Sequence, residues 1–195
     1  VLSFTVDPKT KAKITGMLGK KGMLEKSYYE NLDRTNLEEE EGFKILSNIR
    51  KEPGRVLKSP HRSEGHAIVD LGDDVFTLGR PHPMIDPSLR EERIAKEAAD
   101  PETALLLLDV VLGYGAHEDP CGALAESVSK AKGRVAGRGG YLSVIASITG
   151  TERDPQSYRE QRRTLEAAGV LVLDSNALAA RLALDLVKRA GGGGA

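Results

Sequence analysis

The segment from Gly79 to Asp86 carries the side chains best suited to chemistry. Prolines at positions 81 and 83 restrict the backbone on either side of His82 and so limit where its imidazole can lie. Arg80 supplies a planar guanidinium that suits a carboxylate or a phosphate. We predict that His82 acts as a nucleophile or proton carrier and Arg80 as an anion clamp, with Gly79 at the ligand.

A purely structural role is the alternative for this segment. In that interpretation Arg80 pairs with a nearby acid, and His82 only caps a backbone group. The acids close to it in the sequence are Asp73, Asp74 and Asp86. The sequence alone leaves both interpretations open.

A second candidate loop runs from Gly113 to Asp119. Gly113 and Gly115 allow a ligand to approach the backbone closely, and His117 stands just before a predicted helix start. The alternative is a turn between a strand and a helix, with Asp119 as the N-cap. No second His or Cys stands at ligand spacing from His117, so we predict no metal site.

A third loop, Thr149 to Asp154, has the composition of a small anion cradle. Gly150 and the hydroxyl of Thr151 precede a predicted helix start, and Gln156 adds an amide donor. An ordinary Thr-Gly turn capped by Asp154 explains the same residues. Cys121 begins a helix, but a single small cysteine is more typical of packing than of a nucleophile.

Four apolar runs predict the strands that position these loops: His66 to Leu71, Ala104 to Leu112, Tyr141 to Thr149 and Val170 to Leu173. Runs that are apolar on both faces are typical of parallel strands covered by helices on both sides. Asp-Pro pairs predict three helix starts, at Asp86, Asp119 and Asp154. Ser175 predicts a fourth, for a helix from Ala177 to Arg189, and Gly169 is the expected end of the helix before it.

The first 62 residues differ in composition, with a glutamate run at positions 38 to 41. We predict a charged, mainly helical or partly disordered segment there, with helices around Leu24 to Asn31 and Leu37 to Arg50. Residues 63–190 form the predicted α/β domain, and residues 191–195 a flexible tail. The glycines between Gly16 and Gly22 lack the spacing of a nucleotide-binding P-loop.

Composition limits the classes of partner. With 28 basic and 29 acidic residues, no broad field favours nucleic acid or an anionic membrane. Apolar runs such as Ala104 to Leu108 are far shorter than the roughly 20 residues of a spanning helix. The single cysteine fits a reducing compartment, so we expect a cytoplasmic protein. Because the sequence starts at Val1 rather than Met and stops in Gly191 to Gly194, we expect a piece of a longer polypeptide or a processed chain.

Three stretches resemble the FdrA proteins, which are similar to succinyl-CoA synthetases. The first runs from Ile68 to Pro87, the second joins Leu108–Gly115 to Asp119-Pro120, and the third joins Thr149–Gln156 to Ala168–Val170. The resemblance covers about two-thirds of the chain, His66 to Ala190. Lys20-Lys21-Gly22 stands where the family is expected to carry Gly-Gly-Thr.

The resemblance implies a flavodoxin-like α/β sandwich with a mainly parallel sheet, like the C-terminal domain of a succinyl-CoA synthetase β subunit. It implies an acyl-CoA synthetase that handles an acyl phosphate, with CoA, phosphate or a nucleotide as substrates. The alternatives are a component of an oxamate carbamoyltransferase in allantoin breakdown and a non-catalytic module that docks an α-type subunit; a homodimer is also open. The CoA-binding and phosphohistidine segments of the α-type part are absent, and His66 is not given the phosphohistidine role because it opens a strand.

Overall fold

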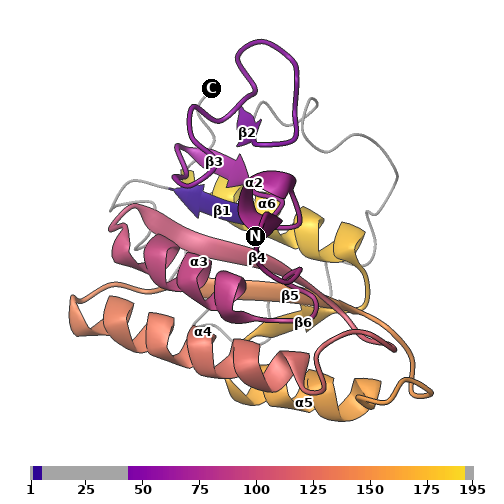
Figure 1. Ribbon diagram of the computed structural model, residues 1–195. Coiled ribbons are helices and arrows are strands. Elements are labelled where there is room, and N and C mark those ends of the chain that lie inside the picture. The colour runs from indigo at the N-terminus through magenta and orange to yellow at the C-terminus, as the bar shows by residue number, and fades with distance from the viewer. Residues whose placement is uncertain (1, 6–43, 192–195) are drawn as a thin grey trace.

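A six-stranded sheet forms the centre of the computed structural model, which describes residues 2–5 and 44–191 (Figure 1). The strands are β1 (Leu2–Thr5), β2 (Ile45–Ser47), β3 (His66–Ile68), β4 (Thr103–Val111), β5 (Ser143–Thr149) and β6 (Leu171–Leu173), in the order β2-β3-β1-β4-β5-β6. Strand β1 is antiparallel to both β3 and β4, whereas β2 pairs in parallel with β3, and β5 with β4 and β6. Five strands therefore share one direction.

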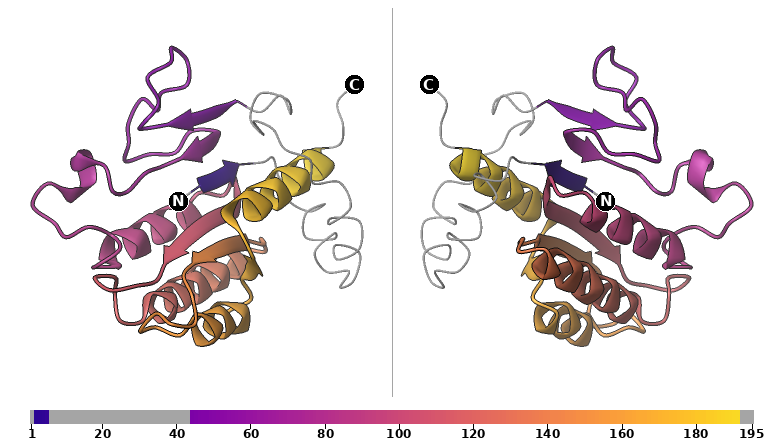
Figure 2. Two further views of the ribbon diagram at one scale, coloured as in Figure 1. Left: turned by 90° about the vertical axis from the view of Figure 1, so that its right-hand side faces the viewer. Right: turned by 90° about the vertical axis from the view of Figure 1, so that its left-hand side faces the viewer.

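Helices cover both faces of this sheet. They are α2 (Asp74–Thr77), α3 (Ser88–Ala99), α4 (Pro120–Gly137), α5 (Tyr158–Ala167) and α6 (Asn176–Gly191). Figure 2 shows α6 on the opposite side of the sheet from α3 and α4. From β3 to β6 the order is the 2-1-3-4-5 order of flavodoxin-like sheets, with β1 reversed. The predicted three-layer α/β sandwich with a mainly parallel sheet is confirmed.

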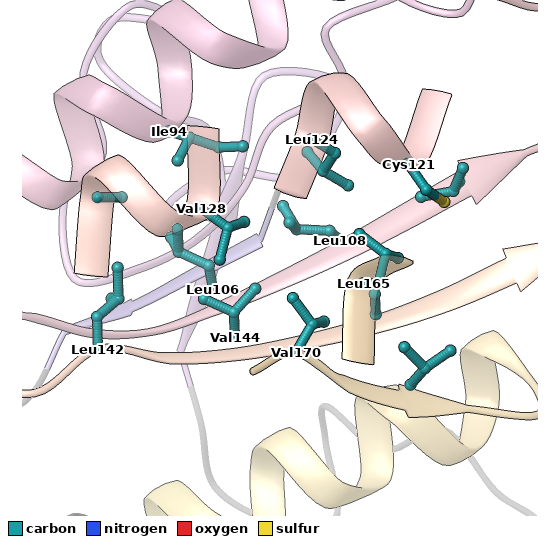
Figure 3. Close-up of a cluster of buried hydrophobic side chains, with 14 of the residues drawn as sticks. Ile94, Leu106, Leu108, Cys121, Leu124, Val128, Leu142, Val144, Leu165 and Val170 are labelled. Carbon is teal, nitrogen blue, oxygen red and sulfur yellow. The ribbon is translucent and has the colours of Figure 1, made fainter. Parts of the chain in front are cut away.

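Alternation along β4 divides the core into two layers. Leu106 and Leu108 face α3 and α4, in the cluster that Figure 3 shows with Leu124 and Val128. Leu105 and Leu107 face the other way, against α6. Because both faces of β4 are buried over these residues, the strand reads as a continuous apolar run.

Helix ends follow the predicted signals at several places. Asp119 caps α4 by accepting the N–H of Gly122 at 3.0 Å, and Pro120 is its first residue. The side chain of Ser175 accepts the N–H of Leu178 at the start of α6. Gly169, with φ 72°, ends α5 while Val170 donates back to Leu165, which is the Schellman arrangement.

Two predicted helix starts move. Helix α3 begins at Ser88, two residues after Asp86, whose carboxylate accepts the N–H of Ser88 at 2.9 Å. Helix α5 begins at Tyr158 rather than at the Asp154-Pro155 pair. Asp154 is unavailable as its cap because its carboxylate binds the N–H of Thr151 at 2.6 Å.

The predicted helix from Leu37 to Arg50 is wrong where the structure describes it, because Ile45–Ser47 forms β2 and pairs with β3. The predicted helix from Leu24 to Asn31, the glycines between Gly16 and Gly22 and Lys20-Lys21-Gly22 lie outside the described residues. Gly191 is the last residue of α6 rather than part of a tail. Within the described ranges, no helix combines the length and apolar character needed to cross a bilayer.

Candidate functional site

The three candidate loops meet at one edge of the sheet. Strands β3, β4 and β5 run in the same direction, so the loops that follow them leave from their shared carboxyl edge. In open α/β sheets, this is the edge at which ligands bind. The backbone N–H of His117 in the second loop donates to the carbonyl of Met84 in the first at 2.8 Å, which joins the two directly.

A groove of about 940 Å³ opens between the carboxyl ends of β3 and β4. Strand β1 separates these strands only as far as Leu2, which faces Ile68 on one side and Leu107 on the other. Beyond Leu2, no other described strand fills the space between them. The groove is lined from β2 and the segment that follows it, β3, β4, α3, α4, α6 and the first two loops.

His82 lines this groove with its ring against Gly72. A Cβ at position 72 would lie 2.6 Å from Nε2 of His82 and 3.1 Å from Oδ1 of Asp70, so a larger residue there would push the ring aside. Nδ1 of His82 accepts the N–H of Met84 at 3.2 Å. An accepting Nδ1 carries no proton, so the neutral ring holds its proton on Nε2. In this state His82 carries a hydrogen-bond donor at Nε2.

His117 lines the groove in the same manner. Its Nδ1 accepts the N–H of Asp119 at 3.1 Å, which again places the proton of the neutral ring on Nε2. Two imidazoles from different loops that line one groove therefore share the same tautomer.

Arg90 of α3 is the third donor at the groove. Its guanidinium donates to the carbonyl of Asp109 in β4 and lies 3.6 Å from the carboxylate of the same residue. The Arg90 side chain is 19% exposed and that of Asp109 is 55% exposed. Asp109 is thus paired but remains accessible from the groove.

Carboxylates outnumber guanidinium groups along the groove. Asp70 is held by Asn48, whose side chain bonds both its N–H and its carbonyl at 2.9 and 3.0 Å. The charged lining residues are Arg50, Glu52, Asp70, Arg90, Glu91 and Asp109. The groove therefore disfavours a highly charged anion and offers acceptors to a ligand that carries hydrogen-bond donors.

Arg80 lies outside the lining of this groove. Its guanidinium forms a two-point pair with Glu92 at 2.9 and 3.2 Å, and it also donates to the hydroxyl of Ser88. Each partner stabilises the charge of the other, so Glu92 raises the pKa of Arg80 and Arg80 lowers the pKa of Glu92. The acid that holds Arg80 is therefore on α3, not one of the three considered from the sequence.

Gln156 and Gly113 face each other rather than the groove. The Gln156 side chain accepts the N–H of Gly113 at 3.0 Å and donates to its carbonyl at 2.9 Å. Gly79, Gly113 and Gly115 all have positive φ, which suits glycine.

The third loop is closed by its own contacts. Both the N–H and the hydroxyl of Thr151 donate to Asp154. Gly150 packs so closely on Leu112 that an added Cβ would lie 2.7 Å from it.

The first turn of α4 is also occupied. The N–H of Cys121 donates to Gln161 at 2.8 Å and the N–H of Gly122 donates to Asp119. Cys121 is buried, and burial raises the pKa of its thiol to about 12. It therefore stays protonated near neutral pH. Among the described residues, no group of three or more His, Cys, Asp or Glu side chains is arranged to hold a metal ion.

Comparison with known proteins identifies relatives of this chain. It is 42% identical to the uncharacterized protein YahF of Escherichia coli (strain K12) over 143 residues, which cover 73% of this chain and 28% of YahF. Residues 29–186 match the family model described as CoA-ligase. The chain belongs to the CoA-ligase family. The chain thus spans less than a third of the length of this relative.

Membership of this family agrees with the observed fold, which forms the groove. A CoA-ligase domain of the succinyl-CoA synthetase type has the α/β architecture seen here, and CoA is a substrate of such ligases. The sequence drew attention to His82 through its flanking prolines, but it did not nominate Arg90, Asp70 or Asp109. A single acid within the apolar run of β4 is the signal that would have found Asp109.

Proposed function

We propose that this CoA-ligase domain belongs to an acyl-CoA synthetase and holds the phosphate of an acyl phosphate in the groove between β3 and β4. The observation that carries the proposal is the pair of imidazoles, His82 and His117, each held by a backbone N–H so that Nε2 is the donor. Arg90 adds a positive charge to the lining of the same groove. Two imidazoles and a guanidinium that line one groove suit a phosphate oxygen on which charge develops.

The remaining predicted residues enter the proposal by position. Arg80 anchors the His82 loop on α3 through Glu92, so it supports the site without contacting the phosphate. Gly79, Gly113, Gly115, Gly150, Thr151 and Gln156 shape the loops next to the groove. CoA itself carries several phosphate charges, and the groove offers only Arg50 and Arg90 against four carboxylates. We therefore propose that CoA binds mainly to another domain or an α-type subunit.

A second candidate is carbamoyl transfer, which the resemblance to FdrA over Ile68 to Pro87 also supports. The favouring observation is the presence of Asp70 and Asp109 on the groove. Their oxygens accept N–H donors, which a carbamoyl group has and a simple acyl group lacks. A dicarboxylic acyl group would meet like charge at the same place.

Calorimetric titration of the purified chain with acetyl phosphate and carbamoyl phosphate tests the proposal. A hydrogen bond to a charged group contributes roughly 1.5–3 kcal/mol, so His82→Ala or His117→Ala should weaken binding about 10- to 100-fold. His61→Ala is the matched control, because His61 is exposed and is not among the residues that line the groove. Equal affinity in all three variants would reject the site.

The two ligands separate the two reactions. If Asp109 accepts a hydrogen bond from a carbamoyl group, Asp109→Asn should weaken the binding of carbamoyl phosphate more than the binding of acetyl phosphate. A parallel loss for both ligands supports the synthetase and contradicts carbamoyl transfer.

A further inference from the structure

The Gly113–Asp119 loop, which carries His117, has little of its own to keep it in place. Gly113 and Gly115 have φ of 134° and 86°, so the loop depends on two positions where the backbone is unusually free. Tyr114 between them is 90% exposed and contributes almost nothing to the core. The N–H of Asp119 holds the His117 ring from within the loop. The loop backbone that carries both residues must be positioned by contacts from outside the loop.

Gln156 makes three of the hydrogen bonds that reach this loop from other segments. Two bind the N–H and the carbonyl of Gly113 at 3.0 and 2.9 Å. The third runs from Nε2 to the carbonyl of His117 at 3.1 Å. Met84 makes a fourth through its carbonyl, which accepts the N–H of His117 at 2.8 Å. Both ends of the loop segment that precedes the imidazole are thus tied to one amide.

Only glutamine has the chemistry that this position uses. Its amide oxygen accepts from one backbone N–H and its NH₂ group donates to two carbonyls, so every group is satisfied although the residue is just 7% exposed. A glutamate would present a second acceptor to two carbonyl oxygens. An apolar side chain would leave two carbonyls and one N–H without these partners.

The backbone next to Gln156 is shaped for this inward placement. Among the described residues, Ser157 is the non-glycine residue with a positive φ, 50°. Such a conformation is uncommon for serine and persists when the surroundings enforce it. It lies between Gln156 and the first residue of α5, so the chain turns sharply there, with Gln156 directed at the second loop.

We propose that Gln156 is a positioning residue for His117: it fixes the loop so that the imidazole keeps its Nδ1 on the N–H of Asp119 and its Nε2 proton in the groove. This inference rests on the proposed function for the role of His117 as a ligand donor. The hydrogen-bond geometry on which it stands does not depend on the identity of the ligand.

Nitrogen-15 NMR of the histidine side chains tests the proposal on the ligand-free chain. The protein has four histidines, so the ring signals can be assigned by single substitutions. In the unsubstituted protein, His82 and His117 should both show the single tautomer protonated at Nε2. In the variant Gln156→Met, the methionine side chain is similar in length to glutamine but has no amide. In this variant His117 should show a mixture of tautomers, while the tautomer of His82 stays unchanged.

Two further variants keep the result interpretable. Val128 lies in α4, and its side chain is fully buried in the core. Val128→Ala removes core contacts away from the loop, so it should lower the stability without changing the tautomer of His82 or His117. Gln156→Glu keeps the size of the side chain and serves if Gln156→Met fails to fold; it too should release His117, because a carboxylate cannot donate to the carbonyls of Gly113 and His117. A single Nε2-protonated tautomer for His117 in a folded Gln156 variant would overturn the proposal.

Titration of the same samples with acetyl phosphate separates this inference from the proposed function. We expect Gln156→Met to bind acetyl phosphate about tenfold more weakly, the effect of one hydrogen bond. If the unsubstituted protein binds no acetyl phosphate but the tautomer result is as expected, the positioning role stands and the proposed ligand is wrong. If binding is strong and equal in both proteins, the positioning role is wrong and the proposed function stands.

Discussion

A side chain at position 150 would collide with Leu112, the residue that follows β4. The Cβ of an alanine there would lie 2.7, 2.8 and 2.9 Å from Cβ, Cγ and Cδ1 of Leu112. Leu112 is buried, and its N–H donates to the carbonyl of Thr149, so it has little freedom to move. Gly150 therefore allows the second and third loops to pack together.

We predict that Gly150→Ala lowers the free energy of unfolding by about 1–3 kcal/mol, the usual cost of forcing extra volume into a packed site. Urea denaturation measures the change. Gly133→Ala is the matched control, because Gly133 lies in α4 with no atom within 4 Å of the added Cβ. That substitution should raise the stability by up to about 1 kcal/mol through better helix propensity. Equal losses in both variants would contradict the collision.

At the scale of elements, β3 contains a titrating side chain at its first position. His66 pairs with Ile45 in the register of the strands, and burial lowers the pKa of its imidazole from the ordinary value of 6.5. The folded state therefore favours the neutral ring. The unfolded chain binds a proton near pH 6.5, so the stabilisation is present above that pH and is lost as the pH falls below it.

We predict that the free energy of unfolding of the unsubstituted protein falls as the pH is lowered from 7.5 to 5.5. The free energy of unfolding of His66→Gln should fall less over the same range. Denaturation in urea at the two pH values gives both slopes. Parallel slopes for the unsubstituted protein and His66→Gln would show that β3 does not carry this dependence.

The elements that the sequence predicted well are those with strong local signals. The continuous apolar runs gave β4 and β5 to within two residues at either end, and the Asp119-Pro120 pair gave the start of α4. Strand β2 was missed because it is only three residues long and is held by pairing with β3, which lies 21 residues further along the chain. Pairing between distant segments leaves no pattern in a short charged stretch.

The same limit applies to the groove. Flanking prolines pointed to His82, and the structure places its ring on the groove. Arg90 on α3 and Asp109 on β4 come together through the packing of the helix on the sheet. No residue near Arg90 in α3 signals this, since its partner is set by the order of the strands.

At the scale of the whole molecule, a buried ionic cluster ties the segment before β3 to the helical layer. Arg93 and Glu97 on α3 are each 4% exposed and form an ion pair at 2.6 Å. Arg93 also donates to the carbonyl of Pro60 at 2.8 Å and to the hydroxyl of Ser63 at 2.6 Å. Ser63 in turn donates to Glu97 at 2.7 Å, so the charges are surrounded by partners.

Removing one charge should cost much more than removing both. Glu97→Leu leaves the buried guanidinium of Arg93 without its carboxylate, and such a loss typically costs about 3–5 kcal/mol. The double variant Arg93→Met/Glu97→Leu leaves no buried charge, so its stability should lie well above that of Glu97→Leu. Urea denaturation of the two single variants and the double variant gives the coupling energy.

Because Pro60 and Ser63 are held by Arg93, amide exchange in residues 57–65 should accelerate in every variant that lacks Arg93, including the double one. Additive losses, or unchanged exchange in that segment, would mean that the cluster does not join the two parts of the molecule.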